Sequence, residues 1–266
     1  MNPADRAPVS YAYHHEDVVL ARAFGDRPDG FYLDVGANHP TQASVTKLFS
    51  DRGWRGVNVE PNPALAALLA IARPRDVNLP IGLSDQPGKL TLHVVEDESG
   101  LSTLDVGQAD GYRKAGRPVT AHEVEVLTLA QVCDRYVGDT PIDFLSIDVE
   151  GYEGAVLAGA DFTRWRPRVL VIEATRPYTN VLCHHSWEPK VLAAGYSFAF
   201  FDGINRFYAR SDEPALLARM GWPANPVDIY QTPDGLELAE YRRYGRAART
   251  VATFTQWIVD RLKGRC

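Results

Sequence analysis

The stretch FYLDVGAN at residues 31–38 constrains the fold more than any other part of the chain. Bulky apolar residues at Phe31, Leu33 and Val35 predict a buried strand, and Gly36 predicts a turn into the next helix. In open α/β sheets, ligands bind at the carboxyl ends of the strands, where the strand order reverses. We therefore expect this turn to form the floor of a cofactor site.

Strands and helices alternate along the rest of the chain. The pattern predicts a mostly parallel sheet with helices on both faces, closed by an antiparallel terminal strand pair. The predicted strands are 31–35, 56–60, 77–83, 89–95, 142–148 and 168–173, with the pair 196–201 and 206–209. The predicted helices are 11–24, 41–52, 61–72, 127–136, 153–160, 187–194 and 236–262. The polar, Gly-rich stretch 96–121 is predicted as a long loop, with 99–117 as a candidate lid.

The chain has 266 residues, which is enough for one large domain with an appendage. We expect a catalytic domain over residues 1–210, including an N-terminal helix at 11–25, and a largely helical C-terminal extension over 211–266. No run of about 18 apolar residues exists, so no membrane span is expected. The N-terminus lacks the apolar core of a secretory signal, and the three cysteines are too few for a disulfide framework, so we expect a cytoplasmic protein.

Charge is distributed unevenly along the chain. The net charge is −6, but residues 236–266 carry +4, so residues 1–235 carry −10. Because phosphate binding needs a basic face, the acidic body argues against a nucleic-acid partner. The basic tail is interpreted as a solvated face, with a helix that forms a homo-oligomer and a patch for an anionic glycolipid or membrane surface as alternatives.

Four predicted strands end in acids, at Asp34, Glu60, Asp148 and Glu173. A single carboxylate at a strand end often only caps the next helix. Because the carboxyl ends of parallel strands meet at one edge of a sheet, we expect these four around one crevice. Several negative charges there suit a ligand that is cationic or rich in hydroxyl groups.

A nicotinamide dinucleotide does not suit the turn at residues 36–41. Such a cofactor needs G-x-G-x-x-G to let the backbone approach its pyrophosphate, but GANHPT has one glycine, and Pro40 removes a donor. A nucleoside cofactor without phosphate, S-adenosylmethionine, suits the site better. Glu60 is then a candidate for the ribose hydroxyls and Gly36 for the methionine portion. Leu83 is a candidate for packing on adenine, with Ser84 or Asp85 at its amine.

The motifs GFYLDVGANHP, GWRGVNVEPNP, ESGLSTLD, IDFLSIDVEGYE, RVLVIEATRP and DGINRFYAR occur in this order between residues 10 and 210. This set resembles the FkbM family of class I S-adenosylmethionine-dependent methyltransferases. The resemblance implies a Rossmann-like class I methyltransferase fold with a seven-stranded sheet. It also implies that Asp34, Gly36 and Asn38 hold the methionine end, that Glu60 holds the ribose and that Asp148 faces the methyl group.

The acceptors known for that family are mostly hydroxyl groups of sugars, in polysaccharides, lipopolysaccharides or secondary metabolites. The resemblance therefore implies an O-methyltransferase that acts on a sugar or glycan hydroxyl. Two alternatives stay open. The chain could be a methyltransferase that acts on a non-sugar acceptor, or a catalytically inactive module that keeps the cofactor pocket as a scaffold. An oxidoreductase on the same fold would need the phosphate-binding turn that the sequence lacks.

A sugar hydroxyl is a poor nucleophile until a base or a metal lowers its effective pKa. Asp148 and Glu150 are the candidate bases, and His184 and His185 are further candidates in the loop after the 168–173 strand. Asp148 and Glu173 are alternatively candidates for binding Mg²⁺ through oxygen ligands. We favour a side-chain base slightly over a metal.

Overall fold

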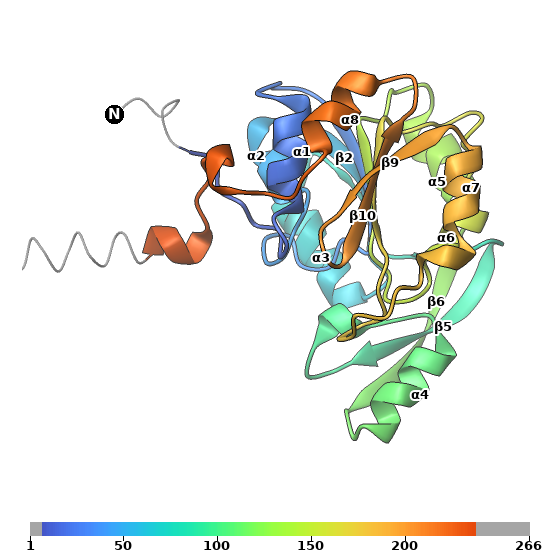
Figure 1. Cartoon of the computed structure of the whole chain (residues 1–266). Coiled ribbons are helices and arrows are strands. Elements are labelled where there is room, and N and C mark those ends of the chain that lie inside the picture. Colours follow the sequence, from blue (N-terminus) through green and yellow to red (C-terminus); the bar gives the residue numbers. More distant parts are fainter. Residues whose placement is uncertain (1–6, 238–266) are drawn as a thin grey trace, which may run out of the picture. The chain divides into compact units, whose positions relative to one another are not determined.

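The structure, a computed structural model, describes residues 7–237 and contains the expected mostly parallel, seven-stranded sheet (Figure 1). Its strands run in the spatial order β3 (Val77–Leu79), β2 (Arg55–Val59), β1 (Phe31–Val35), β7 (Phe144–Ile147), β8 (Val169–Glu173), β10 (Asn205–Arg210) and β9 (Tyr196–Phe201). Neighbours from β3 to β8 pair in parallel, whereas β10 is antiparallel to both β8 and β9. The Rossmann-like α/β prediction and the antiparallel terminal pair are confirmed.

The central strands are apolar on both faces because helices cover both faces. On β1, Tyr32 packs with the helices of one layer and Leu33 with those of the other, and both are buried. One layer contains α1 (Glu16–Phe24), α2 (Lys47–Arg52) and α8 (Pro214–Met220). The other contains α5 (Leu129–Val132), the π-helical turn η3 (Cys133–Val137), α6 (Glu153–Ala158) and α7 (Glu188–Ala193). Helix α3 (Pro63–Ala72) connects β2 to β3 at the edge of the sheet.

Local capping explains where several helices begin. Asn62 precedes α3, and its side chain accepts a hydrogen bond from the Ala64 backbone N–H at 3.0 Å. Thr128 and Gln131 form a reciprocal capping box at the start of α5. This cap explains why α5 begins at Leu129, two residues after the predicted start of that helix.

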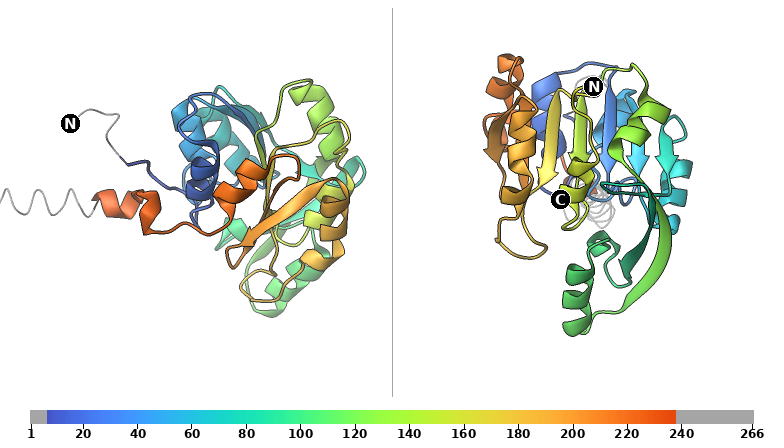
Figure 2. Two further views of the ribbon diagram at one scale, coloured as in Figure 1. Left: turned by 45° about the horizontal axis from the view of Figure 1, so that its top comes forward. Right: turned by 90° about the vertical axis from the view of Figure 1, so that its right-hand side faces the viewer.

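A second sheet has three strands and was not predicted. β4 (Gly82–Leu83) pairs in parallel with β6 (Val119–Leu127), which is antiparallel to β5 (Gly88–Val95). The predicted single strand at 77–83 is wrong, because β3 and β4 belong to different sheets and Pro80 lies between them. The β5–β6 ribbon and α4 (Val106–Lys114) project together from the end of the main sheet (Figure 2).

The predicted loop over 96–121 is also wrong. It contains the 3₁₀ turn η2 (Ser99–Leu101) and α4, and β6 begins at Val119. Helix α4 gives no apolar pattern, because Ala109 is its one buried residue and the helix contains Gly107 and Gly111. Its start is fixed by Asp105, whose carboxylate accepts the backbone N–H of Gln108 at 2.7 Å.

Among the described residues, 11–228 form one compact unit, and 7–10 with 229–237 belong to a second. Within the second unit, the backbone N–H of Ser10 donates to the carbonyl oxygen of Gln231 at 2.8 Å. The predicted helix over 236–262 lies outside the described residues, apart from its first two positions. The domain boundary expected at residue 210 stays a prediction. Within 7–237, no helix is long and apolar enough to cross a bilayer.

Candidate active site

A cavity of about 440 Å³ opens at the carboxyl ends of β1, β2, β7 and β8, and we call it the central cavity. The sheet register explains its position, because Val35 of β1 pairs with Val59 of β2 and with Ile147 of β7. Ile147 in turn pairs with Ile172 of β8. The residues that follow these positions therefore meet at one edge of the sheet, as expected for an open α/β fold. These residues are Gly36, Glu60, Asp148 and Glu173, and all four line the cavity.

The Gly36 turn is packed tightly between two neighbouring strands. The backbone N–H groups of Gly36 and Ala37 both donate to the carbonyl oxygen of Val59, at 3.0 and 3.1 Å. Gly36 has φ +83°, and a β-carbon there would lie 1.7 Å from the carbonyl oxygen of Asp148. Only glycine can occupy this position without moving the Asp148 backbone, which follows β7 directly.

Glu60 is held by two backbone amides. Its carboxylate accepts the N–H of Asn38 at Oε2 and the N–H of Asn62 at Oε1, both at 2.8 Å. Burial raises the pKa of Glu60 to about 7, although these two hydrogen bonds oppose the rise. Each carboxylate oxygen retains a free lone pair, so Glu60 can still accept hydrogen bonds from a ligand.

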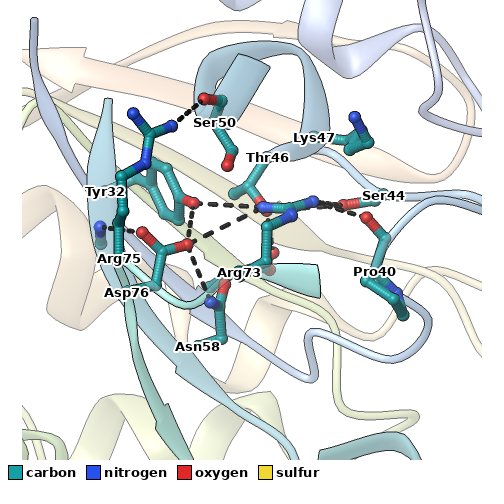
Figure 3. Close-up of polar contacts among 12 residues, drawn as sticks. Tyr32, Pro40, Ser44, Thr46, Lys47, Ser50, Asn58, Arg73, Arg75 and Asp76 are labelled. Carbon is teal, nitrogen blue, oxygen red and sulfur yellow. Dashed lines mark hydrogen bonds and ion pairs between the residues drawn. The ribbon is translucent and has the colours of Figure 1, made fainter. Parts of the chain in front are cut away.

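Asp34 receives its support from a network of polar side chains, and Figure 3 shows the part of this network around Arg73 and Thr46. The hydroxyl of Thr46 donates to Asp34 Oδ2 at 2.7 Å, and the buried guanidinium of Arg73 lies 3.4 Å from the Thr46 hydroxyl oxygen. Arg73 also donates to the Pro40 carbonyl oxygen at 2.6 Å and to Ser44 Oγ at 3.1 Å. Burial raises the pKa of Asp34 to about 6, against the hydrogen bond from Thr46 and the charge of Arg73.

Arg73 and Thr46 were missed by the sequence reasoning. Arg73 follows α3 and Thr46 precedes α2, so their contact joins two helix ends that are 27 residues apart in the chain. No local pattern signals such a contact. The network fixes the 40–46 segment, which borders the cavity at Ser44.

Of the three residues expected near the adenine, one lines the central cavity and two do not. Leu83 is buried and lines the central cavity. Ser84 and Asp85 are not among its lining residues, and the Ser84 hydroxyl donates to Asp85 Oδ1 at 3.0 Å. Asn38 does line the cavity, with φ +49° and a buried side-chain oxygen that has no hydrogen-bond partner among the described residues. The role predicted for each residue stays a prediction.

Three of the predicted acids form one cluster in the central cavity. Carboxylate oxygens of Asp148, Glu150 and Glu173 lie within 4.8 Å of one another. Burial and the charge of Asp148 raise the pKa of Glu150 to about 9. Burial, then Asp148 and Glu150, raise the pKa of Glu173 well above its usual range.

Asp148 is the member of this cluster that opens to the cavity. Its pKa is also raised, because protein atoms surround the carboxyl group although the residue is solvent-accessible. A hydrogen bond with Glu173 and the charge of His14 oppose that rise. The cluster therefore binds protons more readily than isolated carboxylates do.

The loop that carries the cluster is anchored from two sides. Glu153 Oε1 accepts the backbone N–H groups of Val149 at 3.2 Å and Gly151 at 3.0 Å. The hydroxyl of Thr103 donates to the carbonyl oxygen of Glu150 at 2.8 Å. Glu150 adopts φ +54°, a left-handed conformation that is uncommon for residues other than glycine.

The structure does not bring the two predicted loop histidines to the cavity. His184 is buried, its Nε2 lies 3.6 Å from Glu188 Oε2, and its ring lies 4.0 Å from that of His185. Neither residue lines the cavity, whereas His14, just before α1, does. His14 was missed because nothing in its local sequence signals proximity to β7.

Part of the cavity lining comes from the 99–104 segment, which is the first part of the candidate lid. Ser99, Gly100, Leu101, Ser102 and Leu104 contribute to it. Two exposed aromatic residues, Tyr13 and Tyr178, also line the cavity with 79% and 70% of their surface accessible. The cavity thus combines a carboxylate floor with aromatic groups that are open to solvent.

Comparison with known proteins gives one match to a family model, described as the methyltransferase FkbM domain, over residues 34–198. Among solved structures, the chain resembles a TehB-like SAM-dependent methyltransferase from Corynebacterium glutamicum. That likeness has 12% sequence identity and a TM-score of 0.41, and it covers 73% of this chain and 87% of the other. No curated protein matches the chain. The range matched by the family model contains the glycine turn and all four strand-end acids.

Proposed function

Because the chain belongs to the FkbM methyltransferase family, we propose that it transfers a methyl group from S-adenosylmethionine to a hydroxyl group of a sugar. The observation that carries the proposal is the position of Gly36, Glu60 and Asp148 at one edge of the sheet, around one cavity. Transfer needs a donor and an acceptor held in line, and a single enclosed site can hold both.

The residues around the Gly36 turn fit the proposed cofactor. Gly36 lines the cavity and has no side chain, so a methionine portion can lie against its backbone. Glu60 has lone pairs free for two ribose hydroxyls, and buried Leu83 offers an apolar surface for adenine. When bound, S-adenosylmethionine supplies a sulfonium methyl group, whose carbon–sulfur bond breaks as the new carbon–oxygen bond forms.

The acid cluster supports a role at the acceptor end. Asp148 opens to the cavity, so it can accept a hydrogen bond from an acceptor hydroxyl. Glu150 and Glu173 lie beside Asp148, and a carboxylate of this cluster that is ionised can accept the proton that the hydroxyl group loses during transfer. A carboxylate floor with exposed Tyr13 and Tyr178 also matches the two kinds of surface on a sugar, which are its hydroxyl groups and its apolar ring face.

Calorimetric titration with S-adenosylhomocysteine tests the proposed cofactor site. We expect saturable binding by the wild type, and Glu60→Ala should weaken it by about 1.5 to 3 kcal/mol because a charged hydrogen-bond acceptor is lost. Glu123→Ala is the matched control, because this acid lies on the exposed part of β6 and pairs with exposed Lys89. Its affinity should equal that of the wild type.

Methyl incorporation into nucleotide sugars and glycans then tests the acceptor class. Methylation of a sugar hydroxyl that depends on Asp148 would support the proposal. A folded wild-type protein that binds no S-adenosylhomocysteine would overturn it and favour an inactive scaffold. Cofactor binding with methyl transfer to non-sugar compounds alone would retain the methyltransferase and overturn the sugar assignment.

A further inference from the structure

Seven carboxylic acids line the central cavity, and no lysine or arginine is among its lining residues within 7–237. These acids are Glu16, Asp34, Glu60, Glu98, Asp148, Glu150 and Glu173. His14 is the one basic side chain that joins them. An enclosed surface with this composition favours a ligand, or a set of ligands, with substantial positive charge.

The three acids of the cluster lie close together, and two of them have a buried carboxylate oxygen without a hydrogen-bond partner among the described residues. Glu173 is 5% exposed, and its Oε2 forms no hydrogen bond with any described residue. Glu150 Oε2 is likewise buried without a partner. A buried carboxylate oxygen that is left unpaired is costly, so its retention points to a bound group that the protein itself does not supply.

We propose that Asp148, Glu150 and Glu173 bind a hard divalent cation, such as Mg²⁺ or Mn²⁺, on the acceptor side of the central cavity. The proposal deepens the proposed function and rests on it for the role of the cation, which would be to orient an acceptor hydroxyl and lower its pKa. Binding of the ion does not depend on that role and can be measured without cofactor or acceptor.

The spacing of the ligand atoms is compatible with such an ion. Two oxygens on opposite sides of an ion are separated by twice the metal–oxygen distance, about 4.1 Å for Mg²⁺ and about 4.6 to 5.2 Å for Ca²⁺. The carboxylate oxygens lie within 4.8 Å of one another, so small rotations of the side chains would bring them around either ion. All three donors are carboxylate oxygens, which hard divalent cations prefer.

The cluster is also supported in the way that metal ligands require. Glu173 is held at the end of β8, where its backbone pairs with Asn205 of β10. Glu153 and Thr103 fix the loop that carries Asp148 and Glu150. Asp148 is open to the cavity, so an ion held there would keep coordination positions for water or an acceptor hydroxyl.

Electron paramagnetic resonance of Mn²⁺, titrated with the full-length protein in the absence of cofactor, tests the proposal. We expect one tight site, from which Mg²⁺ displaces Mn²⁺. Glu173→Gln and Asp148→Asn should each weaken Mn²⁺ binding by at least about tenfold, because each removes one anionic ligand. Glu98→Gln is the matched control, since it removes an acid from the same cavity but outside the cluster, and it should change the affinity less than about twofold.

The two proposals fail separately. A folded wild type that binds S-adenosylhomocysteine but no Mn²⁺ would overturn the cation site and leave the methyltransferase proposal standing. Mn²⁺ binding without S-adenosylhomocysteine binding would overturn the methyltransferase proposal and leave the cation site standing. Equal losses of Mn²⁺ affinity in Glu98→Gln and in the cluster variants would also overturn the site, because they would show that the ion is attracted by the total negative charge of the cavity. If Glu173→Gln does not fold, Asp148→Asn decides the result, since Asp148 is solvent-accessible.

Discussion

The backbone of Gly36 lies so close to Asp148 that a β-carbon at position 36 would be 1.7 Å from the Asp148 carbonyl oxygen. Gly36 follows β1 directly and Asp148 follows β7 directly, so this contact joins the carboxyl ends of the two central strands. Gly36 also lines the central cavity, so the residue that permits the two strands to pack closely lies at the proposed ligand site. Stability and ligand binding are coupled at this position.

Gly36→Ala tests that coupling, with Gly116→Ala as the matched control. Gly116 has φ +81°, close to the +83° of Gly36, but no atom lies within 4 Å of a β-carbon placed there. The control should lose about 1 kcal/mol of unfolding free energy from backbone strain alone. Gly36→Ala should lose at least about 2 kcal/mol more and should not bind S-adenosylhomocysteine. Urea denaturation and calorimetry measure both effects, and equal losses in the two variants would contradict the contact.

Glu60 predicts a pH-dependent cofactor affinity. Its pKa is raised to about 7, and its ionised form accepts hydrogen bonds from ribose hydroxyls better than its protonated form does. The affinity for S-adenosylhomocysteine should therefore rise with pH, by up to about tenfold between about pH 6 and 8 if binding requires one proton to be lost. In Glu60→Gln this component should disappear. A wild-type affinity that is level across this range would contradict the role of Glu60.

The sequence allows the main sheet and the floor of the cavity to be predicted, for one physical reason. Parallel strands buried on both faces need short continuous apolar runs, and their carboxyl ends meet at one edge. The acids after those runs, Asp34, Glu60, Asp148 and Glu173, are therefore brought together by the topology alone. Their nearness required no knowledge of side-chain packing.

The rest depends on contacts that leave no local pattern. Helix α4 buries only Ala109, so it has no apolar stripe, and the early part of β6 is mostly exposed. Arg73 reaches Thr46 and Pro40 across the fold. His14 lies at the cavity and His184 lies beside Glu188, because the conformations of the loops determine both positions. Tertiary packing, rather than periodicity, determines each of these outcomes.

Arg73 is predicted to be important for stability. Its guanidinium and the carboxylate of Asp76 are both buried, 3.9 Å apart, and Arg73 also donates to the Tyr32 hydroxyl. Arg73→Met leaves Asp76 without its buried cation, so the unfolding free energy should fall by about 3 to 5 kcal/mol. Arg73→Met combined with Asp76→Asn should lose less than the sum of the two single changes.

Urea denaturation measures these losses, with Arg75→Met as the control. Arg75 is exposed and donates to the Ser50 carbonyl oxygen, so its loss should cost less than about 1 kcal/mol. Similar losses in Arg73→Met and Arg75→Met would mean that the buried contacts of Arg73 with Tyr32, Thr46 and Asp76 contribute little to stability.

Glu16 predicts how stability changes with pH. This residue of α1 is buried, its Oε1 accepts Asn205 Nδ2–H at 2.8 Å, and burial raises its pKa to about 8. A carboxyl group with a raised pKa binds its proton more tightly in the folded state. The unfolding free energy should therefore fall as the pH rises from about 4.5 to about 8 and then change no further through this group.

Several other acids in the same cavity also have raised pKa values, so they too lower the wild-type unfolding free energy as the pH rises. The variant Glu16→Gln isolates the contribution of Glu16. Glutamine keeps the shape of the protonated acid but cannot ionise. The difference between variant and wild type should be smallest at about pH 5 and should grow in favour of the variant by a few kcal/mol at about pH 9. Urea denaturation at these two pH values measures it. A difference that does not change with pH would show that Glu16 ionises as readily in the folded protein as in the unfolded chain.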